Sequence, residues 1–234
     1  MTEARALSPA GRPAIEVNGT ELVPDLSGAL YWPEERTLVV ADLHFEKGSS
    51  YAARGVFLPP YDTRATLSAL GEACARLKPV RVVSLGDAFH DAEAEARMGE
   101  EEIEALRALT RAHDWIWIAG NHDPAPPRRV GGLVRERLRL GALLFRHEPL
   151  ERAEPGEVAG HLHPCARLRA NGRSVRRKCF LSDGARLVMP AFGAFTGGLN
   201  VKDEAFKPLF KRYIAWMIGR EGIYPVAPRD LRRD

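Results

Sequence analysis

Five short apolar runs, each followed closely by an Asp, Asn or His residue, constrain this sequence more than any other feature. The runs cover residues 37–41, 80–85, 115–119, 142–145 and 157–159. They contain many β-branched and aromatic residues, which is typical of buried strands. Helical patterns lie between several of the runs, so the sequence predicts an α/β fold.

The polar residues that follow these runs come from separate parts of the chain. The five segments are Asp42-Leu43-His44, Gly86-Asp87, Gly120-Asn121-His122-Asp123, His147 and Gly160-His161-Leu162-His163. Ligands of α/β proteins bind beyond the carboxyl ends of the strands, so we expect these side chains to meet in one cleft. Their oxygen and imidazole nitrogen donors suit divalent Mn, Fe or Zn, and the sequence therefore predicts a metal site.

The spacing inside the first and last segments supports this interpretation. Residues two apart in an extended chain project to the same side, so Asp42 and His44 are expected to bind one ion together. His161 and His163 share that spacing and bind either one ion or one each. If the site binds two divalent ions, the two direct carboxylate ligands, Asp42 and Asp87, offset only part of their charge. The net charge of the site is then positive, which favours a phosphate anion.

Three helices are predicted outside these segments. The first follows Pro59-Pro60, with Asp62 or Thr63 as its N-cap. The second covers residues 100–109. The third is expected over residues 208–218, where apolar side chains recur with a helical period.

The length of 234 residues favours a single domain, which we place at residues 14–224 between flexible tails at 1–13 and 225–234. The N-terminal segment lacks the apolar stretch of a secretory signal, and no apolar run approaches the length of a membrane span. Three widely spaced cysteines suit reduced thiols better than disulfides. These features predict a cytoplasmic protein.

Two arginine-rich segments follow the predicted site residues. The first contains Arg128, Arg129, Arg135, Arg137 and Arg139, and the second contains Arg167, Arg169, Arg173, Arg176, Arg177 and Lys178. Such local positive charge is typical of surfaces that contact a nucleic-acid backbone, but a solvated strand face gives the same alternation. No recognised DNA-reading motif is present, so any such binding is expected to be indifferent to base sequence.

The five polar segments resemble, in identity and order, the five motifs of the calcineurin-like metallophosphoesterases over residues 42–163. Residues 41–48, 58–63 and 190–198 further resemble the ligase-associated DNA damage response endonucleases of the PdeM type. The resemblance implies an αββα sandwich, with two mixed β-sheets flanked by helices and a two-metal centre. It also implies a nuclease or phosphodiesterase acting in DNA repair, with a DNA ligase or helicase as partner.

The same resemblance implies a role for each site residue. One ion would be bound by Asp42, His44, Asp87 and His163, and the other by Asp87, Asn121, His147 and His161. The ions, Mn²⁺ by resemblance with Fe or Zn as alternatives, would share an attacking hydroxide. His122 would stabilise charge at phosphorus or protonate the leaving oxygen, and Asp123 would orient its imidazole.

Four further residues are candidates for substrate binding, namely His90, Lys47, Arg128 and Arg129. His90 is equally compatible with a position on the cleft rim, and Lys47 with an ordinary surface ion pair. Two other functions remain open beside the DNA phosphodiesterase. One is a phosphatase or phosphodiesterase for small molecules such as nucleotides, and the other is a non-catalytic scaffold that recruits repair proteins.

Overall fold

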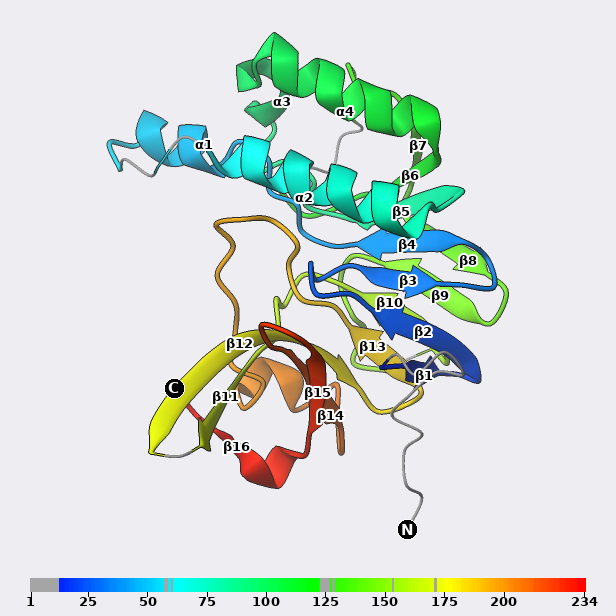
Figure 1. Ribbon diagram of the computed structural model, residues 1–234, viewed down its shortest axis with the longest axis vertical. Coiled ribbons are helices and arrows are strands. Elements are labelled where there is room, and N and C mark those ends of the chain that lie inside the picture. Colours follow the sequence, from blue (N-terminus) through cyan, green and yellow to red (C-terminus); the bar gives the residue numbers. More distant parts are fainter. Residues whose placement is uncertain are drawn as a thin grey trace.

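The computed structural model describes residues 13–56, 59, 61–122, 127, 129–152, 154–170 and 172–234. Two mixed β-sheets lie face to face, and the α-helices pack on the outer side of the first sheet (Figure 1). This confirms the predicted α/β fold with two mixed sheets. None of the described helices is long and apolar enough to span a membrane.

In the described part of the chain, the first sheet contains seven strands in chain order. They are β1 (Ile15–Val17), β2 (Thr20–Pro24), β3 (Leu30–Trp32), β4 (Thr37–Val40), β5 (Arg81–Leu85), β6 (Asp114–Ile118) and β7 (Leu133–Arg135). Strands β1 to β4 pair antiparallel, whereas β4 to β7 pair parallel. The carboxyl ends of β4, β5 and β6 therefore meet at one edge of the sheet.

Among the described residues, four α-helices cover the outer face of this sheet. They are α1 (Lys47–Ala53), α2 (Asp62–Leu77), α3 (Ala94–Arg97) and α4 (Glu100–Ala112). Leu70 of α2 and Leu106 of α4 are fully buried against Leu38 and Val82 of the sheet. The two helices predicted after Pro59-Pro60 and over 100–109 are confirmed.

The second sheet follows the order β15-β14-β12-β13-β10-β9-β8, and β11 and β16 extend it from β12. Its strands are β8 (Arg137–Leu140), β9 (Leu143–Arg146), β10 (Glu157–Ala159), β11 (Cys165–Ala170), β12 (Arg173–Ser182), β13 (Arg186–Val188), β14 (Ile214–Ile218), β15 (Ile223–Val226) and β16 (Leu231–Arg232). The three inner strands β9, β10 and β13 are parallel. All five strands predicted from the apolar runs begin and end within one residue of the expected bounds.

The space between the sheets is filled by large apolar side chains, among them Val39, Leu85, Phe145, Phe180 and Met189. Central strands such as β4 are buried on both faces, which explains why they read as continuous apolar runs. A third cluster, which includes Phe206, Phe210 and Leu231, lies on the other face of the second sheet. We call it the outer cluster. There the described residues form the short 3₁₀ helix η1 (Glu204–Phe206) and strands instead of an α-helix.

The helix predicted over 208–218 is wrong. Residues 214–218 form β14, in which Ala215 and Met217 face the outer cluster and Trp216 faces the space between the sheets. A short run of β-branched and aromatic residues fits a strand buried on both faces as well as a helix, and pairing with β12 decides between them here.

Residues 225–234 also differ from the expected flexible tail. They contain the end of β15, the 3₁₀ helix η2 (Pro228–Asp230) and β16, which pairs antiparallel with β11. Leu231 is only 2% exposed. Burial of this leucine in the outer cluster stabilises the C-terminal segment against the second sheet.

Candidate metal centre

The chain leaves β4, β5 and β10 in an unusual backbone conformation. Asp42, His44, Asp87, His161 and His163 all have positive φ, between 45° and 70°. Non-glycine residues seldom adopt this left-handed region, and they do so mainly where the surrounding structure holds them at functional sites. The extended chain expected for Asp42-Leu43-His44 is therefore wrong, although both side chains do reach the same site.

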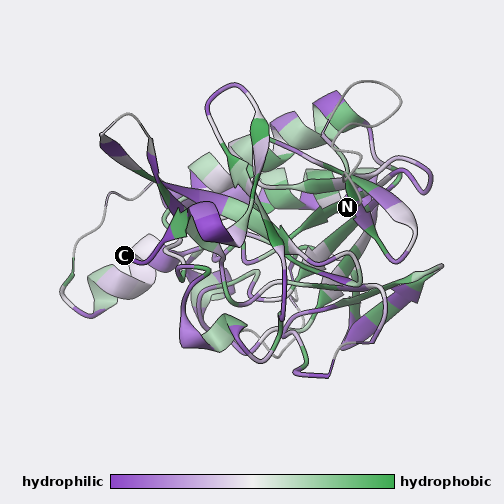
Figure 2. Ribbon diagram, turned by 90° about the horizontal axis from the view of Figure 1, so that it is seen from below, coloured by the Kyte–Doolittle hydropathy of each residue, from purple (hydrophilic) through white to green (hydrophobic). Residues whose placement is uncertain are grey.

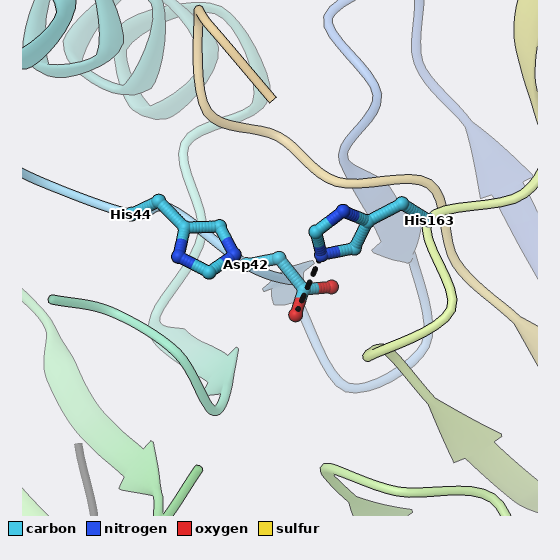
Figure 3. Close-up of side chains that lie close together, drawn as sticks. All are labelled: Asp42, His44 and His163. Atoms are coloured by element: carbon cyan, nitrogen blue, oxygen red, sulfur yellow. Dashed lines mark ion pairs between the residues drawn. The ribbon is translucent and has the colours of Figure 1, made fainter. Parts of the chain in front are cut away.

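The first group of candidate ligands contains Asp42, His44 and His163, whose ligand atoms all lie within 4.8 Å of one another. Figure 3 shows the imidazoles of His44 and His163 beside the carboxylate of Asp42. His163 Nε2 is 3.3 Å from Asp42 Oδ1. The backbone N–H of His161 donates to both carboxylate oxygens of Asp42, at 3.2 and 3.0 Å, and so fixes this fully buried side chain.

The second group contains Asp87, His147 and His161, again with ligand atoms within 4.8 Å. His147 Nε2 lies 3.4 Å from Asp87 Oδ2, 3.2 Å from His161 Nδ1 and 2.8 Å from Asn121 Oδ1. His44 Nε2 from the first group is 3.9 Å from the same oxygen of Asp87. Asp87 therefore lies between the two groups.

The contacts inside the site fit a pair of divalent cations. His163 Nε2 is buried without a hydrogen-bond partner among the described residues. His147 Nε2 and His161 Nδ1 lie 3.2 Å apart, so these two ligand atoms converge on one position. Buried polar atoms without partners are costly, and a cation with nitrogen and carboxylate ligands would satisfy them.

Two glycines make room for these side chains. A Cβ atom on Gly160 would lie 2.7 Å from Asp42 Oδ2 and 3.2 Å from the Leu85 carbonyl oxygen. A Cβ on Gly86 would overlap the imidazole of His147. Both positions therefore require glycine for the close approach of the backbone to the candidate ligands.

Protonation of the site follows from burial and charge. Burial and the neighbouring His163 lower the pKa of His44 to about 3, so this imidazole is neutral and able to bind a metal. Burial acts in the same direction on His147, but the carboxylates of Asp87 and Asp42 outweigh it and raise the pKa of His147 to about 9. A cation must therefore displace a proton from His147 at neutral pH.

His122 lies at the exposed side of the site. Its backbone N–H donates to Asp87 Oδ1 at 2.9 Å, and its Nδ1 is 3.0 Å from the carbonyl oxygen of His90. The rings of His90 and His122 are stacked with centroids 5.5 Å apart. Asp123, the expected orienting residue, lies outside the described residues, and the His90 carbonyl already fixes Nδ1–H as the donor.

The segment around Asp62 supports the site in a way that the sequence did not indicate. Asp62 Oδ2 accepts from Gly48 N at 2.8 Å, and Thr63 Oγ1 contacts both the backbone N–H and the carboxylate of Glu46, at 2.9 and 2.8 Å. Neither side chain caps α2, whose N-cap is Tyr61 without a side-chain bond, so the predicted N-cap is wrong. These side chains instead anchor the turn that follows His44.

The segment 190–198 runs from the second sheet toward α1 and α2 (Figure 1). Gly193 N donates to the Asp42 carbonyl oxygen at 3.2 Å. Lys178 Nζ donates to Ala191 O, Gly193 O and Thr196 Oγ1, at 2.8, 3.0 and 3.0 Å. Lys178 thus holds this segment in place, whereas its position in a basic run had suggested contact with phosphate.

The candidate substrate-binding residues separate in space. His90 Nδ1 is 3.5 Å from His44 Nδ1. The centroid of the Tyr51 ring lies 5.8 Å from the His90 ring centroid and 5.8 Å from Lys47 Nζ. Arg129 instead forms an ion pair with Glu100 of α4. Arg128 lies outside the described residues. His90 and Lys47 therefore border the site, and the charge of Arg129 is offset by a carboxylate.

Comparison with known proteins agrees with this geometry. The family model for calcineurin-like phosphoesterases matches residues 35–186, a range that holds both groups of candidate ligands, and the chain belongs to this family. A crystal structure of the nuclease MPE of Pseudomonas putida is similar, with 30% identity and a TM-score of 0.73. The similarity covers 91% of this chain and 98% of the nuclease, which is consistent with the narrower resemblance to the PdeM type.

A second solved structure, the phosphoesterase Yfce from E. coli, has 15% identity and a TM-score of 0.41, and the match covers 82% of this chain and 98% of that protein. Among curated proteins, no match to this sequence is found. The family and the nuclease neighbour identify this chain as a metal-dependent phosphoester hydrolase, as predicted from the sequence.

Proposed function

We propose that this protein is a two-metal phosphodiesterase that cleaves DNA and acts in DNA repair. The observation that carries the proposal is the position of Asp87 between two groups of buried ligand atoms. A carboxylate in that position suits a bridge between two ions. The similarity to the Pseudomonas putida nuclease supports a nucleic-acid substrate.

In this proposal Asp42, His44 and His163 bind one ion, and Asn121, His147 and His161 bind the other, with Asp87 shared. When bound, the two cations supply water activation and neutralisation of phosphate charge. The family resemblance favours Mn²⁺. It also provides the link to repair, with a DNA ligase or helicase as partner.

The chain itself positions the leaving group through His122. Its backbone is tied to Asp87, and the His90 carbonyl holds Nδ1, so Nε2 is the atom available to substrate. A protonated Nε2 at this exposed side donates to a phosphate oxygen or to the leaving oxygen. His90 and Lys47, on the same side, contact the substrate next to the scissile bond.

The test uses protein stripped with chelator and reloaded separately with Mn²⁺, Fe²⁺, Zn²⁺ or Mg²⁺. Each form is assayed on chromogenic phosphomonoesters and phosphodiesters, then on single-stranded, duplex and nicked DNA. We expect diester hydrolysis and DNA cleavage with Mn²⁺. If small esters were hydrolysed while DNA stayed uncleaved, the protein would be a small-molecule phosphoesterase. If no substrate were turned over despite two bound ions, the protein would be a scaffold.

A further inference from the structure

One face of the sheet β12-β11-β16 carries four arginines at neighbouring positions. In the strand register Arg167 lies opposite both Arg176 and Arg232, and Arg169 follows on the same face. The opposite face of these strands carries Ala166, Leu168 and Leu231 and packs into the outer cluster. We call the four residues Arg167, Arg169, Arg176 and Arg232 the arginine face.

This face has little compensating negative charge among the described residues. Asp234 Oδ1 lies 3.2 Å from Arg176 Nε and 4.0 Å from Arg167 Nη1, and no described carboxylate comes within ion-pair distance of Arg169. Like charges directly opposite each other on a sheet are destabilising. The side chains of Arg167 and Arg176 are 37% and 40% exposed, and Figure 2 colours much of this part of the sheet as hydrophilic.

The other arginine-rich segment is different. Arg137 and Arg139 on β8 both pair with Glu154, with N–O distances of 3.6 and 2.7 Å. Their exposed side chains fit the alternative of a solvated strand face. The two segments look alike in sequence, but Glu154 contacts both arginines of β8, whereas Asp234 contacts only two of the four arginines on the arginine face.

The arginine face starts next to the metal centre. Strand β11 begins two residues after His163, and Arg176 Nη2 donates to the carbonyl oxygen of Gly198 at 2.6 Å. Gly198 in turn packs against the carbonyl oxygen of His163, where no Cβ would fit. The four residue steps from His163 to Arg167 span at most about 14 Å, which is a few nucleotides of an extended strand.

We propose that the arginine face binds the sugar–phosphate backbone of a DNA strand whose scissile phosphate lies at the metal centre. This inference rests on the proposed function for its substrate class. Residues on one face of a strand repeat every ~6.6 Å, close to the spacing of phosphates in an extended nucleic-acid strand. Arginine binds phosphate oxygens in a bidentate manner without reading bases, so binding is independent of sequence.

The test compares the double variant Arg167→Gln/Arg169→Gln with the matched control Arg137→Gln/Arg139→Gln on β8. Binding of a fluorescently labelled single-stranded DNA about 12 nucleotides long is followed by anisotropy between about 50 and 200 mM salt. Loss of two phosphate contacts is expected to weaken binding about tenfold at physiological salt and to reduce the salt slope by about 1.4. The control should bind as the unchanged protein does.

Hydrolysis of a small chromogenic diester, which is too short to reach Arg167, should stay within about twofold in both double variants. Thermal unfolding of each variant checks for a folding defect. The Arg167→Lys/Arg169→Lys variant keeps both positive charges and should therefore keep the salt slope. Equal DNA affinity in the glutamine variant, or an equal loss in the control, would overturn the inference while leaving the proposed function intact. If DNA binding depended on this face but the protein hydrolysed no phosphodiester, the proposed function would fail while binding by the arginine face would stand.

Discussion

The metal centre and the arginine face adjoin in the chain, yet they use polar side chains in opposite ways. At the centre, Asp42, Asp87 and His147 are buried, and the backbone of Asp42 and Asp87 is held in the left-handed conformation. On the arginine face, Arg167 and Arg169 lie on the same face of a regular strand, where Arg169 is exposed and Arg167 is half-buried. We therefore expect changes at the centre to act on turnover and metal content, and changes on the face to act on DNA affinity alone.

The largest effect is expected for Asp87→Asn. This change keeps the shape but removes the charge that lies between the two groups of ligands, so both ion sites weaken together. We expect loss of most bound metal and a fall in kcat/KM of roughly 10³-fold or more. Elemental analysis and steady-state kinetics on the chromogenic diester measure both. Full occupancy of two ions in this variant would rule out a shared Asp87.

His122→Ala should separate chemistry from metal binding. Its side chain is at the exposed side of the site, and only its backbone N–H contacts Asp87. We expect kcat to fall about 10²-fold with unchanged metal content. A diester with a very good leaving group should be less affected, because its leaving oxygen needs no proton. If the variant instead lost its metal, His122 would belong to the ligand set and the proposed role would be wrong.

Metal affinity should depend on pH through His147. Asp87 and Asp42 raise its pKa from 6.5 to about 9, so its stabilising proton is fully present below pH 6.5 and is lost as the pH rises through about 9. A cation competes with that proton, and its apparent affinity should fall about tenfold for each pH unit below about 9. Titration calorimetry in buffers of different ionisation enthalpy measures the proton released. His147→Asn, which cannot hold the proton, should flatten the slope; a flat slope in the unchanged protein would contradict the assignment.

Comparison of the two regions also shows what the sequence can predict. The five strands and the meeting of their terminal Asp and His residues were predictable, because apolar runs and strand ends are local features. The left-handed conformation of Asp42 and His44 was not, since it is imposed by neighbours such as the backbone of Asp87 and Gly193.

Two further differences have the same origin. Asp62 has the composition and position of an N-cap for α2 but binds Gly48, which lies 14 residues earlier in the chain. Lys178 stands in a run of arginines, yet it is half-buried and donates three hydrogen bonds to the segment at 191–196. Local patterns predict which elements form, whereas contacts between distant segments decide what each polar side chain does.

The smallest effect we predict concerns space around Asp42, and it uses two glycines. Gly160→Ala places a Cβ 2.7 Å from Asp42 Oδ2, so the carboxylate or the backbone must shift by a fraction of an ångström. We expect about tenfold weaker metal binding, comparable to loss of a supporting contact. Gly71→Ala on α2 meets no atom within 4 Å and should instead raise the free energy of unfolding by about 0.5–1 kcal/mol with no change in metal binding. Equal metal affinity in the two variants would mean that the close approach at Gly160 serves packing alone. The buried centre would then tolerate a small shift of Asp42 without loss of metal.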